Sequence, residues 1–243
     1  MIYHTDCKVC GGSGYRLEVI DGYETFLECA CIQPQRIRRY LYNSGIRYGE
    51  YEKKSLNTFR EDTEEARRMK AIAKQFLADG KATGMGFFGK PGTGKTHICI
   101  AACQEYTRKQ CLPHHYFSYR REIQRLKAVY YEAEPYGRLM ERWQTCQMLY
   151  MDDLLKFAQD ARGGFLGQEL QILYDIINAR YINRVKTIFS SEYTVSELCE
   201  IDSALGSRIY EMISPYGMKC EGKNRRIAPE KKAGRKENEP DVT

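Results

Sequence analysis

The sequence predicts an α/β fold in which helices cover a parallel sheet, with a small cysteine-bearing module in front of it. From about residue 63, short apolar runs alternate with stretches whose apolar residues recur at helical spacing. That alternation is typical of parallel strands joined by crossover helices. Four of the ten cysteines lie within the first 31 residues, which sets this segment apart from the rest.

The composition is that of a globular chain. With 243 residues, 42% hydrophobic and 29% charged, the chain has room for one full domain and a small module, and it is not mainly disordered. No apolar stretch approaches the roughly 18–20 residues of a membrane span, and no signal segment opens the chain. We therefore expect a cytoplasmic protein, without a membrane partner and with reduced cysteines. The net charge of +6 is compatible with an anionic partner.

Four parts are expected along the chain: a cysteine module at 1–40, a linker at 41–62, the helix–strand domain at 63–227, and a charged, disordered tail at 228–243. The module contains an expected hairpin, with strands at 15–19 and 25–27 around the Asp21-Gly22 turn. An arginine-rich helix is expected at 33–42.

Apolar runs and helical spacing define the elements of the main domain. The expected strands lie at 85–88, 116–119, 148–151 and 187–189. The expected helices are one through Ala66, Met69, Ala73, Phe76 and Leu77, then 96–110, 120–131 and 168–184. Thr194 and Glu197 form the capping box of a further helix.

The segment Gly89-Lys90-Pro91-Gly92-Thr93-Gly94-Lys95-Thr96 fits the phosphate-loop pattern in full. Its glycines let backbone N–H groups turn toward one point at a helix N-terminus, where they bind phosphate. Lys95 is expected to reach the β- and γ-phosphates of ATP, and the Thr96 hydroxyl to bind Mg²⁺. A glycine-rich turn without function is the alternative, which the flanking strand and helix disfavour. A kinase glycine-rich loop matches less well.

The strand at 148–151 is followed by Asp152 and Asp153. Strand carboxyl ends face the ligand crevice of a parallel sheet. We predict that Asp152 binds the Mg²⁺ together with Thr96, and that Asp153 orients or deprotonates the attacking water. The alternative is that these acids only cap a following helix.

The first cysteines, Cys7, Cys10, Cys29 and Cys31, offer four thiols on two turns. Zn²⁺ prefers four soft ligands, and a module this small needs a metal to be stable. We predict a structural Zn²⁺ site. His4 is a possible substitute ligand, and four unrelated thiols or a redox pair are the alternatives.

Together, the phosphate loop, the acidic strand end and the cysteine module resemble bacterial and phage replicative helicase loaders of the AAA+ class, the DnaC/DnaI type. The likeness covers nearly the whole chain except the tail. It includes the Ser44-Gly45-Ile46 and 56–59 linker segments, and also Gly94-Lys95-Thr96-His97, Ile176–Tyr181, Thr187–Ser191 and Gly206-Ser207-Arg208-Ile209.

The resemblance implies an ATPase that forms a homo-oligomer on ATP binding. Arg208 matches the arginine finger that completes a neighbouring subunit's site. Arg226 matches the sensor-2 arginine, which contacts the nucleotide of its own subunit, and Arg225 is the alternative for that role. The implied nucleotide-binding residues are Gly89, Pro91, Gly92, Thr93, Gly94, Lys95, Thr96, His97, Asp152 and Arg226. The implied catalytic residues are Lys95, Asp153, Ser191 and Arg208.

One position departs from the family pattern. The sensor-1 strand of the family ends in Thr/Ser-Asn, whereas Ser191 is followed here by Glu192. An ionised Glu only accepts hydrogen bonds and repels phosphate. We expect slow hydrolysis, or Ser191 in the sensor role, and faster hydrolysis in a Glu192→Asn variant.

The resemblance also implies partners. Residues 1–40 would dock on a DnaB-type replicative helicase, and the AAA+ domain would bind single-stranded DNA. Tyr116, Phe117, Tyr119, Arg120 and Arg121 are candidates for DNA contact by stacking and charge, but the interpretation that we favour for them is a core strand followed by a solvated helix start. The expected function is ATP-dependent loading of the helicase during replication initiation. The rivals are an IstB-type transposition-accessory ATPase, a non-hydrolysing helicase-binding adaptor or inhibitor, and, more distantly, a small-molecule kinase.

Overall fold

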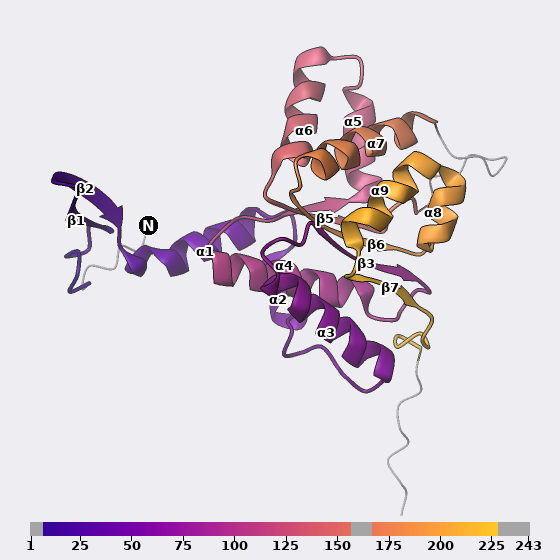
Figure 1. Ribbon diagram of the computed structural model, residues 1–243, viewed down its shortest axis with the longest axis horizontal. Coiled ribbons are helices and arrows are strands. Elements are labelled where there is room, and N and C mark those ends of the chain that lie inside the picture. Colours follow the sequence, from indigo (N-terminus) through magenta and orange to yellow (C-terminus); the bar gives the residue numbers. More distant parts are fainter. Residues whose placement is uncertain (1–6, 157–166, 228–243) are drawn as a thin grey trace, which may run out of the picture.

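Five parallel strands form the central sheet of this protein, in the order β4–β5–β6–β3–β7. The computed structural model describes residues 7–156 and 167–227. The strands are β3 (Gly84–Gly89), β4 (His115–Ser118), β5 (Met148–Asp152), β6 (Lys186–Ser191) and β7 (Gly217–Cys220). Their carboxyl ends therefore meet at one edge of the sheet (Figure 1), and the predicted α/β fold is confirmed.

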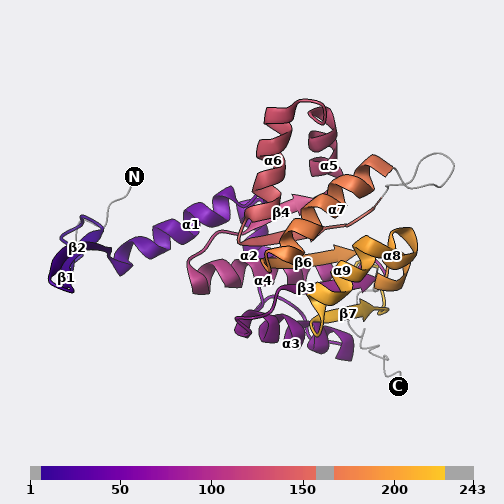
Figure 2. The same ribbon diagram turned by 45° about the horizontal axis from the view of Figure 1, so that its top comes forward.

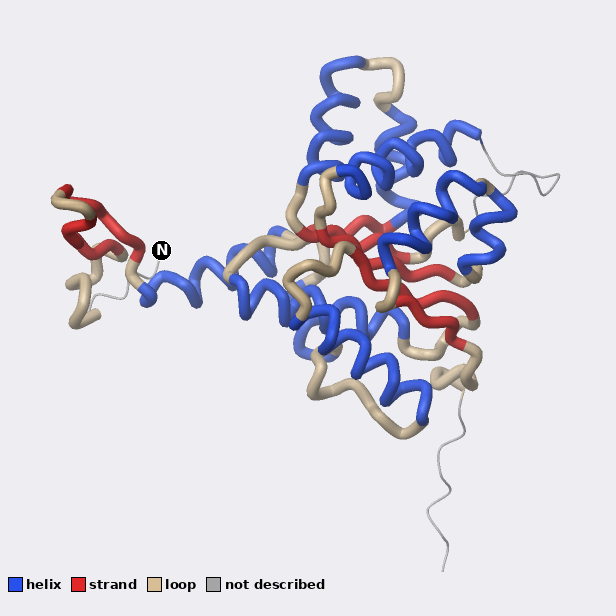
Figure 3. The backbone as a smooth tube through the Cα atoms, viewed as in Figure 1, coloured by secondary structure: helices blue, strands red, loops and turns tan. Residues whose placement is uncertain are grey.

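Helices cover both faces of this sheet (Figure 3). One face carries α3 (Glu64–Ala78) and α4 (Lys95–Gln110). The other carries α5 (Tyr119–Ala128), α6 (Ala133–Thr145), α7 (Gly167–Ile182), α8 (Val195–Ile201) and α9 (Ser203–Ile213). Because both faces are covered, β3 and β5 are buried along their whole length and read as apolar runs instead of alternating with polar residues.

Two hydrophobic cores follow from the pleat of the strands. Phe87 of β3 packs in the core that contains Phe76 of α3, whereas its neighbour Phe88 packs in the core that contains Ile209 of α9. All four side chains are at most 1% exposed. Successive strand residues point to opposite faces, so β3 contributes side chains to the cores on both sides of the sheet.

The N-terminal part forms a hairpin of β1 (Tyr15–Ile20) and β2 (Tyr23–Glu28), followed by a 3₁₀ turn (Ala30–Ile32) and α1 (Gln33–Asn43). Figure 2 shows α1 projecting from the sheet and holding the hairpin at its far end. Helix α1 is continuous across residue 40, where the first boundary was expected. The four-part division stays a prediction, and the expected disordered tail lies outside the described residues.

The segment at 41–62 contains a helix, α2 (Tyr48–Lys53), that the sequence analysis did not predict. Its Tyr51 is buried, and the Tyr51 hydroxyl lies 2.7 Å from Nε2 of the fully buried His114. The linker is therefore packed onto the main domain. None of the described helices combines the length and apolar character that crossing a bilayer requires.

Candidate functional site

The phosphate loop joins β3 to α4, as its sequence pattern requires. Gly89 and Gly92 have φ angles of 110° and 77°, which favour glycine. A Cβ atom on Gly89 would lie 2.6 Å from the Cys220 carbonyl oxygen, and one on Gly92 would lie 1.9 Å from Oδ1 of Asn224. The segment after β7 thus lies directly against the loop, and side chains are excluded at both positions.

Lys95 is the first residue of α4 and is 6% exposed. Its ammonium donates to the carbonyl oxygens of Gly89 and Lys90, at 2.6 and 2.7 Å. Burial lowers its pKa from the ordinary value. The loop therefore holds one ammonium group against its own backbone, next to a helix N-terminus, and this is an arrangement suited to binding an anion.

Asp152 ends β5 and is also 6% exposed. The Thr96 hydroxyl donates to its Oδ1 at 3.3 Å, so the structure brings together the two predicted Mg²⁺ ligands. Hydroxyl groups of Tyr116 and Ser190 also donate to this carboxylate, at 2.7 and 2.6 Å, and so does the Tyr150 hydroxyl. Paired hydroxyl and carboxylate oxygens fit the ligand preference of Mg²⁺, and the three supporting hydroxyls were not predicted.

Asp153 follows in a left-handed conformation, with φ of 54°. Burial, and then the charge of Asp152, raises its pKa, which suits a group that accepts a proton. Its Oδ2 lies 3.3 Å from Nζ of Lys156, and that Nζ lies 2.8 Å from Oε1 of Glu192. Neither Lys156 nor this ion-pair chain was predicted.

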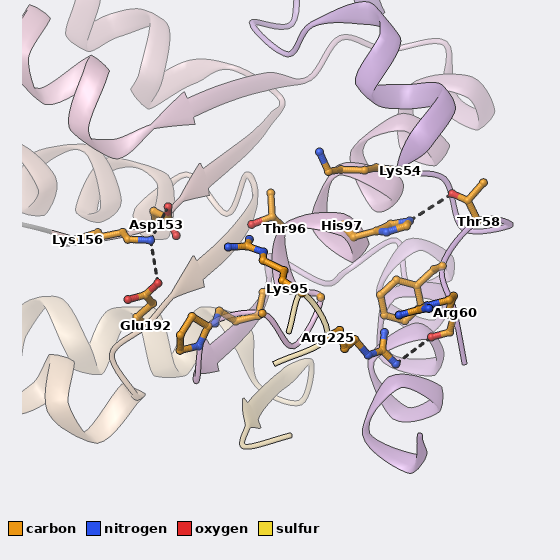
Figure 4. Close-up of a pocket in the computed structure, with 15 residues that line it drawn as sticks. Lys54, Thr58, Arg60, Lys95, Thr96, His97, Asp153, Lys156, Glu192 and Arg225 are labelled. Atoms are coloured by element: carbon orange, nitrogen blue, oxygen red, sulfur yellow. Dashed lines mark hydrogen bonds and ion pairs between the residues drawn. The ribbon is translucent and has the colours of Figure 1, made fainter. Parts of the chain in front are cut away.

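These residues surround one cavity of about 460 Å³, a volume typical of small-ligand sites. Figure 4 shows Lys95 and Thr96 between the acidic residues on one side and the linker residues on the other. The lining residues are Lys54, Thr58, Phe59, Arg60, Pro91, Gly92, Gly94, Lys95, Thr96, His97, Asp153, Lys156, Glu192, Arg225 and Arg226. The predicted Gly89, Thr93, Asp152, Ser191 and Arg208 are not among them.

The linker supplies the wall opposite the acidic residues. His97 contacts it through Nε2, which lies 3.1 Å from the Ser55 carbonyl oxygen, and its ring packs edge-on against Phe59 at 5.1 Å. Burial lowers the pKa of His97. The Arg225 guanidinium lies 5.5 Å above the Phe59 ring and pairs with Asp62. Because both Arg225 and Arg226 line the cavity, both stay candidates for the sensor-2 arginine.

Two predicted catalytic residues lie elsewhere. Ser191 is fully buried, and its hydroxyl donates to the Leu154 carbonyl oxygen at 2.8 Å, which does not favour a sensor role. Arg208 lies on α9, where its Nε donates to Oδ1 of Asn178 at 2.8 Å and its guanidinium lies 4.8 Å from the Tyr174 ring. Arg208 therefore does not reach the cavity of its own subunit. Its role in a neighbouring site stays a prediction.

The aromatic side chains at 116–119 pack in or against the cores, which is the interpretation that we favoured over DNA contact. Phe117 is 0% exposed and Tyr119 is 2% exposed, with its hydroxyl bonded to Glu169. The Tyr116 hydroxyl is bonded to Asp152. The rings of Phe117 and Tyr119 are buried and therefore cannot stack on bases, whereas Tyr116 is half-buried with its hydroxyl held by Asp152. Arg120 and Arg121 are exposed on α5.

The four N-terminal thiols converge, as the zinc prediction requires. The sulfur atoms of Cys7, Cys10, Cys29 and Cys31 all lie within 4.8 Å of one another. Cys7 and Cys29 are 3.7 Å apart, and Cys10 and Cys31 are 3.5 Å apart. Tetrahedral Zn²⁺ with Zn–S bonds of about 2.3 Å separates its sulfurs by about 3.8 Å, so the four thiols fit this ion.

Hydrogen bonding prepares this cluster for a metal. The pKa of Cys10 falls to about 6: burial acts to raise it, but hydrogen bonds from the Gly14 N–H and from Cys31 prevail. Burial and contact with the neighbouring thiols raise the pKa of Cys31 to about 12. A cluster with one thiolate at neutral pH already carries a ligand in the form that binds zinc.

Comparison with curated proteins gives two relatives from Bacillus subtilis (strain 168), and no family model matches the chain. The phage-like element PBSX protein XkdC is 29% identical over 219 residues, which are 87% of this chain and 80% of that protein. The uncharacterized protein YqaM is 28% identical over 197 residues, which are 78% of this chain and 61% of that protein.

Solved structures share the fold at lower identity. A DnaC helicase loader is 21% identical with a TM-score of 0.57, over 70% of this chain and 96% of that one. DnaI is 18% identical with a TM-score of 0.56, over 75% and 95%. The replication initiator DnaA, bound to AMPPCP and single-stranded DNA, is 20% identical with a TM-score of 0.58, over 71% and 51%. The α/β body of this chain therefore shares its fold with the DnaC helicase loader, with DnaI and with DnaA.

Proposed function

We propose that this protein is an ATPase that binds ATP·Mg²⁺ in the cavity beside the phosphate loop. The observation that carries the proposal is the 3.3 Å contact between the Thr96 hydroxyl and Asp152, made while Lys95 lies buried in the loop next to them. AMPPCP in the DnaA structure of the same fold supports nucleotide as the ligand. In this arrangement Lys95 and the loop amides bind phosphate, and Asp153 accepts a proton from the attacking water.

Calorimetry with AMPPCP and Mg²⁺ tests this proposal. Wild type should bind the nucleotide, and Lys95→Met should lose at least about 100-fold in affinity, because a buried ammonium–phosphate contact is removed. A Lys109→Met variant, altered at an exposed Lys109–Glu105 pair on the same helix, serves as the control. Equal affinity of the Lys95→Met variant and wild type would contradict the assignment.

Helicase loading is the cellular role that we propose for this ATPase, on the strength of the fold shared with DnaC and DnaI. The hairpin offers a docking surface. Leu17 faces Phe26 across the two strands, and Tyr15 and Val19 lie on the same face. The four side chains are 50–74% exposed, and a patch of this kind marks a protein-binding site.

Co-precipitation with the purified replicative helicase tests this surface in the full chain. A Leu17→Glu/Phe26→Glu variant should lose helicase binding, because charge replaces the centre of the apolar face. A Thr25→Glu variant places the same charge on the opposite face of the hairpin and should still bind. Undiminished binding of the double variant would refute docking through this surface.

Single-stranded DNA is the second proposed partner, supported by the DNA-bound DnaA of the same fold. Since Phe117 and Tyr119 are buried and the Tyr116 hydroxyl is bonded to Asp152, we assign the contact to exposed arginines of α5, Arg120, Arg121 and Arg125. Binding should then depend on phosphate and weaken steeply with salt, without sequence preference. An Arg121→Gln/Arg125→Gln variant should show a smaller salt slope.

A non-hydrolysing helicase adaptor is the second candidate function, and Glu192 at the sensor position favours it. Steady-state ATP hydrolysis, measured with and without single-stranded DNA, separates the two. Turnover that depends on Asp153 supports the loader, whereas nucleotide binding without turnover supports the adaptor. The cysteine module argues against an IstB-type transposition ATPase.

A further inference from the structure

Lys156 stands between two carboxylates at the mouth of the nucleotide cavity. Its Nζ lies 2.8 Å from Oε1 of Glu192 and 3.3 Å from Oδ2 of Asp153. Figure 4 shows this ammonium between the two acids, opposite Lys95 and Thr96. All five side chains line the same cavity.

The chain adopts an unusual turn to bring Lys156 there. Asp153 and Leu155 both have left-handed backbone conformations, with φ of 54° and 61°, which are rare for residues other than glycine and cluster at functional sites. The Lys156 N–H bonds to the Asp153 carbonyl oxygen at 3.0 Å, and the Leu154 N–H bonds to the Ser190 carbonyl oxygen at 2.9 Å. The turn is thereby folded back onto the end of β6, where Glu192 follows.

The charges of these groups give Lys156 a role that Glu192 alone cannot fill. A carboxylate has no proton to donate to phosphate, whereas an ammonium has three donors and a charge that attracts it. Lys95 lines the cavity from the phosphate loop, and Lys156 lines it from the turn after β5, on the side of the acidic residues (Figure 4). A triphosphate held by the loop would therefore have a second ammonium group in the same cavity.

We propose that Lys156 donates to the γ-phosphate of bound ATP, and that Glu192 positions its ammonium for this contact. The inference rests on the proposed ATP site and adds a specific contact to it. Glu192 acts through Lys156 and is a positioning residue.

Affinities for AMPPCP and ADP, each with Mg²⁺, test this contact in the full-length protein because only AMPPCP carries a γ-phosphate. Lys156→Met should weaken AMPPCP binding about tenfold and leave ADP binding within about twofold. Lys156→Arg should restore most of the loss, since it keeps the charge. Lys109→Met, at the exposed pair on α4, should keep the wild-type ratio of the two affinities.

The positioning role has its own test. Glu192→Gln should lower AMPPCP affinity less than Lys156→Met does, and should have no further effect in the Lys156→Met background, because coupled residues are not additive. A gain in AMPPCP affinity in Glu192→Gln, or additive losses, would overturn positioning. An unchanged AMPPCP-to-ADP ratio in Lys156→Met would overturn the contact while the ATP site stands. If wild type binds neither nucleotide, the proposed function itself fails, and this contact fails with it.

The hydrolysis rate gives a further discriminating result. The resemblance to the helicase loaders predicts faster hydrolysis for Glu192→Asn, because it implies an asparagine at this position. Positioning of Lys156 by Glu192 predicts slower hydrolysis instead, because the ammonium loses its charged anchor. A faster Glu192→Asn variant would therefore contradict the inference.

Discussion

The hydroxyl of Tyr116 donates a 2.7 Å hydrogen bond to Oδ2 of Asp152, across two neighbouring strands of the sheet. Tyr116 lies opposite Tyr150 in the register of β4 and β5, and the rings of the two tyrosines lie 5.4 Å apart. Both hydroxyls thus reach the same carboxylate from adjacent positions. Asp152 is oriented by neighbours that never contact the nucleotide in the proposed site.

Tyr116→Phe should weaken Mg²⁺-dependent AMPPCP binding by about tenfold, as is common when an outer hydrogen bond to a metal ligand is lost. The phenyl ring keeps its packing, so the cost is confined to the orientation of Asp152. The measurement is a Mg²⁺ titration of AMPPCP affinity. Tyr216→Phe is the matched control, since it removes a 2.9 Å hydrogen bond to Asp79, outside the cavity. Equal Mg²⁺ dependence in both variants would contradict this positioning.

The four-cysteine cluster of the N-terminal module should hold a zinc ion in the purified protein. Wild type purified without chelator should contain about one zinc per chain, and Cys10→Ser should lose it, because one thiolate of four is replaced by a poor ligand. Cys111→Ser changes a cysteine outside the cluster and should keep the metal. Elemental analysis after gel filtration measures this. Full zinc occupancy in Cys10→Ser would contradict a four-thiolate site.

Acid should destabilise the protein through His114. Burial, with a smaller contribution from the charge of His115, lowers the pKa of His114 to about 3, against an ordinary value of about 6.5. The unfolded chain therefore binds a proton between these values that the folded protein does not bind. The contribution of His114 to the free energy of unfolding is therefore greatest above pH 6.5. It declines as the pH falls toward 3, by up to about 1.4 kcal/mol per pH unit.

Urea unfolding at pH 5.5 and 4.5 measures this slope. His114→Gln should be less stable at neutral pH but should lose about 1.4 kcal/mol less than wild type between these two pH values. Thr107→Val removes the 2.7 Å hydrogen bond to Nδ1 of His114 and keeps the imidazole, so it should retain the steep slope. Identical slopes in wild type and His114→Gln would exclude His114 as the titrating group.

Four of the five strands described in the sheet, β3 to β6, and the phosphate loop could be predicted because their signals are local. An apolar run such as 148–151 and a complete phosphate-loop pattern can be recognised without knowing which residues lie beside them in the fold. Helix α6 was missed because Pro135 and Gly137 interrupt its pattern near the start. Strand β7 was missed because a short edge strand with exposed residues has no apolar run.

The interior of the candidate site could not be predicted from local signals. Tyr116 was a candidate for DNA contact because aromatic and basic residues follow one another there, and only the sheet order and register show that its hydroxyl reaches Asp152. Lys156 reaches Glu192 only because Asp153 and Leu155 adopt left-handed backbone conformations, which the local sequence does not predict. Residues supplied by several strands become neighbours through long-range pairing, which a single sequence does not specify.

The role of Arg208 leads to a prediction about subunits. Because this guanidinium is bonded to Asn178 and stacked on Tyr174, away from its own cavity, Arg208→Ala should leave AMPPCP affinity within about twofold. It should lower ATP turnover about 10³-fold, the usual effect of a lost arginine finger. Lys95→Met should instead lose nucleotide binding.

Mixing these two inactive variants tests whether Arg208 acts in a neighbouring subunit. Arg208→Ala chains keep an intact cavity, and Lys95→Met chains keep an intact arginine, so a mixed oligomer contains some complete sites at subunit junctions. Turnover should therefore reappear on mixing and peak at an intermediate ratio of the two chains. If Arg208 acts only within its own chain, no ratio restores activity, because neither variant then supplies what the other lacks.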